Sequence, residues 1–374
     1  MKPRIAVVCR GAGGEGSVAR AALRQASELA GAFAVHVISD SFPTAGEGPF
    51  ERVVIAPREF RFLRRFAHVP NEISFARAAR AALERTRPDF VVTHAHAVAL
   101  LAALPLRQRT GARFALVTHG DIFDRPEGMY DSRLAAFYRY VTPRAYRAAD
   151  LVVALSPYMA DFAVAGGARR VEVVPNGIDG RELGLAGTTT THAGAQEGPL
   201  RLLYVGRLSV EKGVEHLLAA CELLSNRGVA YSLTLVGAGP RLEPLRRAAA
   251  AHPEIRFLPA RERAELGAIY SSADLVCIPS LSEALPGVAL EALVAGTPVL
   301  ATDTGGNRFI VVDGENGVLV QPGSAVAIAD AIEALARDRG RLQRLARNSV
   351  ASAERFRWDV VGARLTALIR EHLG

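Results

Sequence analysis

Two cations in the second half of the chain, five residues apart, are of the kinds that bind phosphate. Arg207 and Lys212 stand in the run Gly206-Arg-Leu-Ser-Val-Glu-Lys-Gly213, between an expected strand end and an expected helix start. Arg offers a planar fork of donors and Lys a point charge, which together suit a diphosphate bearing about two negative charges. Cations are common in such loops, so the pair alone does not define a site.

Two carboxylates, eight residues apart, form a second set. Glu283 lies in an expected loop after the apolar run 275–278, and Glu291 lies two turns into the helix that follows. Gly287 is typical of a helix start, where the backbone N–H groups of Gly287 and Val288 attract phosphate. A carboxylate on the helix suits the two hydroxyls of a ribose, and one in the loop suits the hydroxyls of a sugar.

A glycine-rich loop follows the first expected strand and opens the first expected helix. In Gly11-Ala-Gly-Gly-Glu-Gly16, Gly13 and Gly14 would let an anion approach the backbone closely. The spacing also approximates a nicotinamide-dinucleotide motif, with Asp40 near the end of the second strand. An NAD-dependent oxidoreductase therefore stays open as an alternative, and so does a plain tight turn.

Histidines end two strands of the first half, His119 after 113–118 and His94-Ala-His96 after 89–93. No Cys or acidic residue stands near His94 at ligand spacing, and no Asp-x-Asp occurs, so we expect no metal and no other cofactor. The widely separated Cys9, Cys221 and Cys277 are expected to be reduced thiols of the core.

The segment 58–66 forms two arcs when projected at about 100° per residue. One arc is apolar and the other is basic, with Phe60, Phe62, Leu63 and Phe66 opposite Arg58, Arg61, Arg64 and Arg65. Such a helix can rest on anionic lipid, and it can equally pack on the core with a solvated basic face. The reduced thiols predict a cytoplasmic protein, and the first interpretation of this segment adds a peripheral position at the inner face of the membrane.

Short apolar runs alternate with stretches of helical period, which predicts parallel sheets covered by helices on both faces. Expected strands of the first half are 4–9, 34–39, 51–55, 89–93, 113–118, 151–155 and 171–174. Those of the second half are 201–205, 231–236, 255–258, 275–278, 298–301 and 317–320. We therefore predict an α/β protein with domains at 1–178 and 199–356, a linker at 179–198, and a last helix at 357–374 on the first domain.

Composition fits two globular domains in 374 residues, of which 49% are apolar. No apolar run reaches the roughly 18 residues of a spanning helix. The net charge of +7 favours anionic partners such as nucleotide diphosphates or anionic lipid. No aromatic and basic platform for single-stranded nucleic acid is found, so we expect no nucleic-acid partner.

In the order of its motifs, nearly the whole chain resembles glycosyltransferase family 4, the retaining enzymes of the GT-B fold. The motifs are the Arg207 loop, the Glu283 to Glu291 segment, Val174–Asp179, Val236–Pro240, Ala295–Val299, Thr304–Gly306 and Asp313–Gly317. Two departures are Leu285-Pro286, where many relatives have Phe-Gly, and Phe309, preceded by Arg308, where relatives usually have Glu.

The resemblance implies two Rossmann-like domains facing across a cleft, with Arg207 and Lys212 on the donor diphosphate. It implies Glu291 on the ribose, Glu283 on the donor sugar, and His119 near the reaction centre. Gly13, Gly14, Gly206, Gly287 and Val288 complete the expected donor site.

The activity implied is retaining, metal-independent transfer of a hexose-type sugar from a UDP- or GDP-sugar to an acceptor hydroxyl. The acceptor is expected to be an envelope polysaccharide or a glycolipid, and a soluble secondary metabolite is the alternative.

Overall fold

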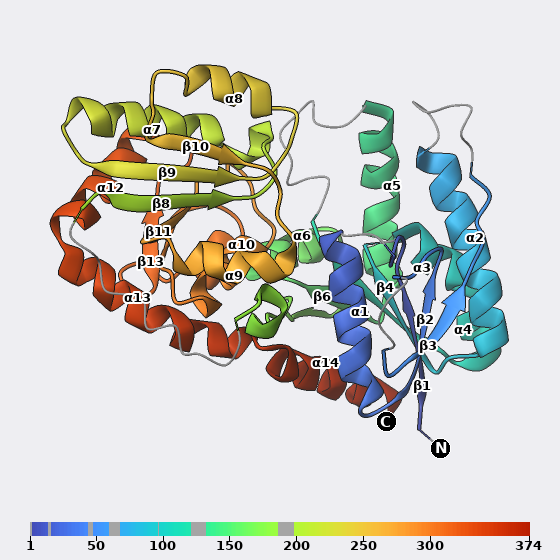
Figure 1. Cartoon of the computed structure of the whole chain (residues 1–374). Helices are drawn as coiled ribbons and strands as arrows, with labels where there is room; N and C mark the ends of the chain where they lie inside the picture. Colours follow the sequence, from blue (N-terminus) through green and yellow to red (C-terminus); the bar gives the residue numbers. More distant parts are fainter. Residues whose placement is uncertain are drawn as a thin grey trace. The chain divides into compact units, whose positions relative to one another are not determined.

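Apolar runs form the strands of two separate parallel sheets, one in each of two units of the chain (Figure 1). The computed structural model describes residues 2–13, 16–43, 48–59, 68–95, 97–120, 132–185 and 198–374. Unit 1 comprises Met1–Gly177 and Trp358–Gly374, and unit 2 comprises Ile178–Arg357. Among the described helices, none combines the length and the apolar character needed to cross a bilayer.

The sheet of unit 1 has seven strands in the order β3-β2-β1-β4-β5-β6-β7. Each strand pairs in parallel with its neighbours, and Ile5 to Val8 of the interior strand β1 are fully buried, as expected where helices cover both faces. The strands are β1 (Arg4–Val8), β2 (Ala34–Ser39), β3 (Glu51–Val54), β4 (Phe90–His94), β5 (Arg113–Thr118), β6 (Leu151–Ala154) and β7 (Val171–Val173).

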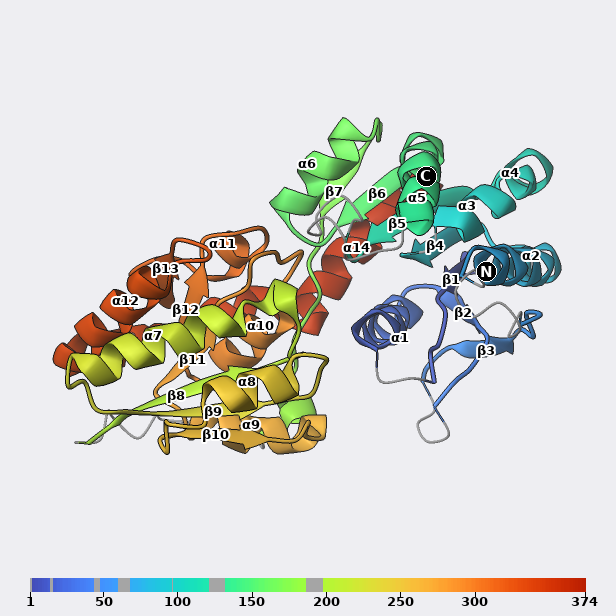
Figure 2. The same cartoon turned by 90° about the horizontal axis from the view of Figure 1, so that it is seen from above.

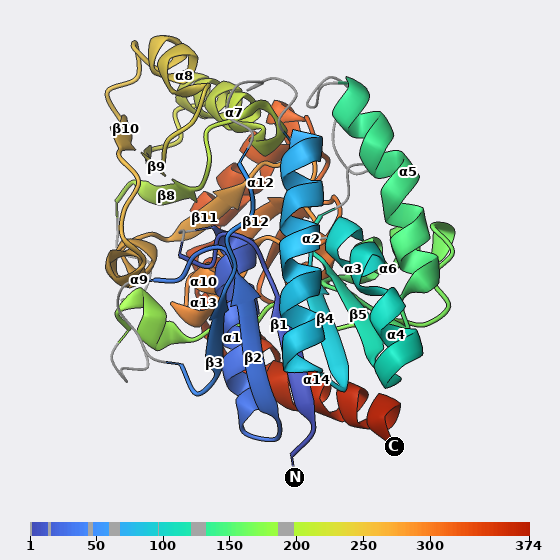
Figure 3. The same cartoon turned by 90° about the vertical axis from the view of Figure 1, so that its right-hand side faces the viewer.

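Helices α2, α3 and α5 cover one face of this sheet, and Figure 3 shows them in front of its strands. Helix α14 packs beside α1, where a Cβ at Gly362 would stand only 2.5 Å from Cβ of Glu28. The helices of unit 1 are α1 (Ser17–Ala30), α2 (His68–Thr86), α3 (Ala97–Ala103), α4 (Pro105–Thr110), α5 (Ser132–Ala148), α6 (Pro157–Ala165) and α14 (Trp358–Leu373).

The sheet of unit 2 has six parallel strands in the order β10-β9-β8-β11-β12-β13. They are β8 (Leu200–Val205), β9 (Tyr231–Val236), β10 (Ile255–Leu258), β11 (Leu275–Ile278), β12 (Val299–Thr302) and β13 (Gly317–Val320). Together with unit 1, this confirms the predicted α/β class with two Rossmann-like domains, and the expected strands agree with the observed ones to within a residue or two.

Two apolar cores lie on the two faces of this sheet. Helices α7 and α12 run side by side over one face, as Figures 1 and 2 show, while α9 and α10 cover the other. The helices are η2 (Gly180–Leu183), η3 (Val210–Lys212), α7 (Val214–Asn226), α8 (Leu242–Ala248), α9 (Arg263–Ser271), α10 (Gly287–Val294), α11 (Asn307–Ile310), α12 (Ala325–Arg337), α13 (Arg339–Ala353) and η4 (Glu354–Phe356).

The predicted linker at 179–198 is wrong for its first part. Residues 179–185 belong to unit 2, where the short helix η2 packs on α9. Leu183 is fully buried, and Gly184, with φ +74°, approaches the carbonyl oxygen of Ala264 so closely that a Cβ would lie 2.2 Å away. A single buried leucine creates no periodic pattern of apolar residues, so the sequence does not reveal this contact. Residues 186–197 lie outside the described part.

Charge is unevenly divided between the units. Unit 1 contains 26 Lys and Arg against 18 Asp and Glu, and unit 2 contains 19 against 20, which together make the 45 and 38 of the chain. The excess of positive charge therefore belongs wholly to unit 1.

Candidate functional site

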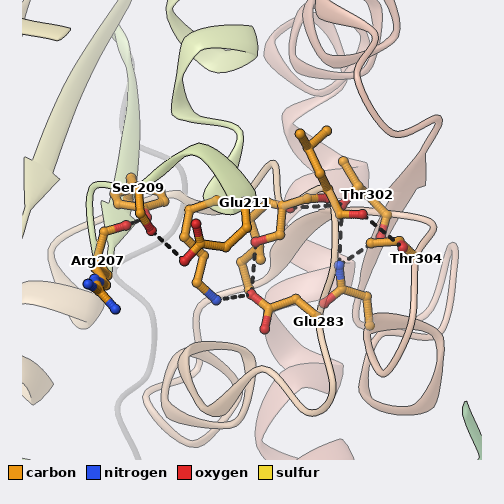
Figure 4. A network of polar contacts seen from close by, with 12 residues as sticks. Arg207, Ser209, Glu211, Glu283, Thr302 and Thr304 are labelled. Atoms are coloured by element: carbon orange, nitrogen blue, oxygen red, sulfur yellow. Dashed lines mark hydrogen bonds and ion pairs between the residues drawn. The ribbon is translucent and has the colours of Figure 1, made fainter. Parts of the chain in front are cut away.

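Lys212 and Glu283, expected in separate loops, lie in direct contact in unit 2. The Nζ atom of Lys212, at the end of η3, is 2.6 Å from Oε1 of Glu283, which follows β11 (Figure 4). The Ser280 hydroxyl donates to the same oxygen over 2.8 Å. The Glu283 side chain is only 10% exposed. Its carboxylate is therefore held by a cation and a hydroxyl at Oε1, and no described residue donates to its Oε2.

Glycines allow the backbones around this pair to approach closely. Gly213 has φ +60°, and a Cβ there would lie 2.2 Å from the carbonyl oxygen of Pro279. At Gly305 a Cβ would lie 1.9 Å from the carbonyl oxygen of Glu283. The N–H of Gly306 donates to that same oxygen over 2.7 Å. Gly305 and Gly306 thus pack against the backbone of the Glu283 loop.

Arg207 has a fixed main chain and an exposed side chain. Its carbonyl oxygen accepts a 2.7 Å hydrogen bond from the hydroxyl of Tyr204. In Figure 4 its guanidinium points away from the polar network, and it has no hydrogen bond or ion pair with the described residues. An Arg held only at its backbone can turn toward an anion.

Glu211, between Arg207 and Lys212 in the same loop, has a lowered pKa. Burial raises this pKa, but a 2.6 Å hydrogen bond from Ser209, and after it the charges of Lys212 and Arg207, lower it overall. Both cations therefore lie close enough to Glu211 to stabilise its charged form.

Glu291 points into the interior of unit 2 from α10 and is 8% exposed. Arg263 reaches its Oε1 through Nη1, and the hydroxyl of Tyr270 donates to its Oε2 over 2.7 Å. The sequence predicted the carboxylate and missed both partners, which stand 28 and 21 residues away. The only sequence signal for these partners is that α9, which carries both, is the helix before α10 in the series of strands and helices.

The N-terminus of α10 carries no side-chain cap. Pro286 precedes the helix, and at Gly287 a Cβ would meet no atom within 4 Å. The N–H groups of Gly287 and Val288 come before the first intrahelical hydrogen bond and therefore point out of the helix. With the helix dipole behind them, they offer an anion site beside the Glu283 loop.

In unit 1, His119 pairs with another histidine. Its Nε2 lies 3.0 Å from Nδ1 of His94, which is fully buried at the end of β4. His119 and Thr118 line a cavity of about 300 Å³. Residues of α5 at i, i+4 spacing also line this cavity: Leu134, Tyr138, Thr142 and Tyr146. That spacing was readable in the sequence, whereas the contact with His94 was not, and His96 lies outside the described residues.

The glycine loop of unit 1 has its amides occupied by side chains. The N–H groups of Gly11 and Gly13 donate to Asp40 over 2.6 Å and to Ser41 over 3.2 Å. Asp40 also lies 3.5 Å from Arg10. These contacts favour the tight-turn interpretation over a dinucleotide site, because the acidic residue is engaged by the loop itself. Gly14 lies outside the described residues.

The departure at Phe309 has a structural explanation. Its ring packs edge-on against Phe356 with centroids 5.7 Å apart, and Arg355 donates to its carbonyl oxygen over 2.7 Å. Arg308 forms a two-pronged ion pair with Asp303. An aromatic contact thus stands where the family resemblance predicted a Glu.

The three cysteines lie in the core. Cys9, Cys221 and Cys277 are buried free thiols, and burial raises the pKa of Cys9 to about 12. Within the described ranges, no three His, Cys, Asp or Glu side chains are grouped so as to hold a metal ion.

Comparison with known families and curated proteins covers both units. Residues 190–351 match the family model for glycosyl transferases group 1, and residues 17–181 match that for glycosyltransferase family 4. The chain is 37% identical over 202 residues to D-inositol 3-phosphate glycosyltransferase of Nocardia farcinica, covering 50% of this chain and 45% of that protein. It is 31% identical over 285 residues to glycogen synthase of Mycobacterium tuberculosis, covering 74% and 67%.

Solved structures share the fold over almost the full length. Sucrose-phosphate synthase from Thermosynechococcus elongatus superposes with a TM-score of 0.84 at 21% identity, covering 99% of both chains. Anabaena HepE in complex with UDP-glucose superposes with a TM-score of 0.75 at 19% identity, covering 98% and 99%. At these identities the likeness concerns the fold alone.

Proposed function

The chain belongs to glycosyltransferase family 4, the group 1 glycosyltransferases, and we propose that it transfers a hexose-type sugar from a UDP- or GDP-sugar to an acceptor hydroxyl. The observation that carries this proposal is the contact of Lys212 with Glu283 beside the uncapped start of α10. That arrangement offers positive charge and a sugar-binding carboxylate at one place. UDP-glucose bound to the similar fold of HepE makes UDP-sugars the first donors to test.

For each group of the donor we propose a partner in unit 2. The exposed guanidinium of Arg207 and the amides of Gly287 and Val288 would bind the diphosphate. Lys212 would share its charge between Glu283 and the phosphate. Glu291 would accept hydrogen bonds from the ribose, and Oε2 of Glu283 would accept one from the donor sugar.

The chemical step breaks the bond between the anomeric carbon and the phosphate oxygen and forms a bond from that carbon to the acceptor oxygen. Negative charge develops on the leaving diphosphate, where Arg207, Lys212 and the α10 amides would stabilise it. Because these groups supply the positive charge, we propose that transfer needs no metal ion. Retention follows if the acceptor attacks from the face of the departing phosphate, whose oxygen takes the acceptor proton.

The cavity beside His119 is the proposed place of the acceptor. It combines apolar walls with the Thr118 hydroxyl, which is buried and has no hydrogen-bond partner among the described residues. Such an oxygen is costly to bury unless a ligand or water pairs with it. A hydroxyl-bearing ring with an apolar face fits these walls, as in an envelope glycan or glycolipid. A soluble secondary metabolite is the alternative acceptor.

We also propose that the enzyme works at the inner face of the cytoplasmic membrane. The excess of positive charge in unit 1 supports contact with anionic lipid through that unit. The amphipathic segment 58–66 was predicted to make this contact, but residues 60–67 lie outside the described part.

A binding screen tests the donor proposal. Thermal unfolding of the protein would be followed with UDP, GDP, ADP and NAD at the same concentration. We expect stabilisation by UDP or GDP, since a ligand at about 100 times its Kd adds about 2.7 kcal/mol. Stabilisation by NAD alone would overturn the proposal in favour of an oxidoreductase.

A further inference from the structure

Glu291 is held in place from two sides by one helix. Arg263 is the first residue of α9, and Tyr270 stands near its end. Each takes a different carboxylate oxygen, Oε1 for Arg263 and Oε2 for Tyr270. A long and otherwise flexible side chain is thus oriented before any ligand arrives, so its ordering does not have to be achieved on binding.

These contacts leave a defined set of acceptor positions. An ionised carboxylate offers about four lone-pair positions, two on each oxygen. Arg263 and Tyr270 occupy one on each oxygen of Glu291, so with respect to the described residues one position remains on each oxygen. Two neighbouring hydroxyls, each donating one hydrogen bond, match that arrangement.

Arg263 also supplies the buried carboxylate of Glu291 with a counter-ion. The Nε atom of Arg263 is 3.1 Å from Oε2 of Glu182, on η2. Burial lowers the pKa of Arg263, but the charges of Glu291 and Glu182 outweigh that effect and raise it. Held between two carboxylates, this cation is not free to follow a phosphate.

Tyr270 serves as a permanent donor. It is fully buried, and burial together with the charge of Glu291 raises its pKa well above the ordinary value. The hydroxyl therefore keeps its proton and donates a hydrogen bond to Glu291. The hydroxyl of Thr297 in turn donates to the carbonyl oxygen of Tyr270 over 2.8 Å, which ties down the end of α9.

We propose that Tyr270 and Arg263 are positioning residues that aim Glu291 at two adjacent ribose hydroxyls at once, and so make the site selective for ribonucleotides over 2′-deoxyribonucleotides. This inference rests on the proposed function, because it takes the placement of a nucleoside diphosphate at Glu291 from it.

The experiment compares Tyr270→Phe with a matched control, Tyr231→Phe. Tyr231, the first residue of β9, likewise donates a hydrogen bond to a glutamate of unit 2, but its acceptor is Oε1 of Glu254, at 2.8 Å, and not Glu291. Titration calorimetry would give the Kd of UDP, dUDP, GDP and dGDP for each protein. We expect the wild type to prefer the ribose form about tenfold or more, the scale of one hydrogen bond to a charged group.

Tyr270→Phe should reduce that preference several-fold, because it weakens the binding of UDP or GDP and leaves the Kd of the deoxy form nearly unchanged. Tyr231→Phe should retain the wild-type ratio. Arg263→Gln, which keeps a planar donor without the charge, should reduce the ratio as Tyr270→Phe does and serves if the latter does not fold.

A folded Tyr270→Phe protein with the wild-type ratio would overturn the inference, and so would equal weakening of both sugar forms. These outcomes leave the proposed function standing, because a ribonucleotide still binds. Absence of binding of both UDP and GDP to the wild type would instead reject the proposed function, and this inference with it.

Discussion

Replacing Lys212 with Ala would separate a role in the reaction from a role in the fold. Its Nζ lies 2.6 Å from Glu283, whose side chain is 10% exposed, while that of Lys212 is 27% exposed. Breaking a fully buried pair costs about 3–5 kcal/mol, but solvent reaches Lys212 and Ser280 still serves the carboxylate. We therefore expect a loss of about 1–2 kcal/mol in the free energy of unfolding.

The effect on turnover should be larger than the effect on stability. Removing one electrostatic donor from developing charge lowers kcat by about 10²–10³. That factor corresponds to about 3–4 kcal/mol in the activation free energy. Urea unfolding would give the first quantity, and initial rates at saturating donor would give the second.

The double variant Lys212→Ala with Glu283→Gln serves as the control. It removes the unpaired buried charge, so stability should return toward the wild type. Turnover should stay low, because the cation that meets the leaving phosphate and the carboxylate proposed to bind the sugar are both missing. A folded Lys212→Ala protein with kcat within about threefold of the wild type would refute the reasoning.

Three further predictions follow from the site and from unit 1. Ser209→Ala should lower the free energy of unfolding at pH 7 by about 1 kcal/mol or less. The folded state lowers the pKa of Glu211, so the stability difference between wild type and variant should be present above the pKa of Glu211 in the unfolded chain and vanish as pH falls through its pKa in the folded protein. A difference in urea unfolding that stays constant with pH would contradict this. Arg207→Ala should lower kcat by about 10²–10³, and EDTA should leave the wild-type rate unchanged; strict dependence on Mg²⁺ or Mn²⁺ would show that the leaving-group machinery is wrongly assigned. Wild type should co-sediment with anionic but not neutral vesicles, less so in salt, because exposed charges are screened within about 10 Å at 0.1 M. The quadruple Ser variant of Arg58, Arg61, Arg64 and Arg65 should co-sediment less than wild type. Equal recovery of the two proteins in the supernatant would reject membrane contact.

The sheets could be predicted because strands buried on both faces leave contiguous apolar runs in the sequence, as at 275–278. The order of the units followed from the restart of that pattern after residue 198. What failed was the short helix η2, whose attachment depends on one buried side chain, Leu183, and on the absence of a Cβ at Gly184.

For the site, residue types pointed to Lys212 and Glu283 as separate ligands of a donor, but not to their contact. That contact depends on how two loops are brought together by Gly213 and Gly305. The partners of Glu291 stayed hidden for the same reason: Arg263 and Tyr270 come from another helix, and no local pattern reports such distances.

Turnover of nucleotide sugars tests the central claim most directly. The purified protein would be incubated with UDP- and GDP-hexoses in EDTA, and proton NMR would follow the nucleoside diphosphate and the anomer of the sugar first released to water. We predict release of UDP or GDP with the donor's anomeric configuration retained, at a rate that falls by about 10²–10³ in Lys212→Ala. An inverted sugar, or no release above that of Lys212→Ala from any of these donors, would contradict it.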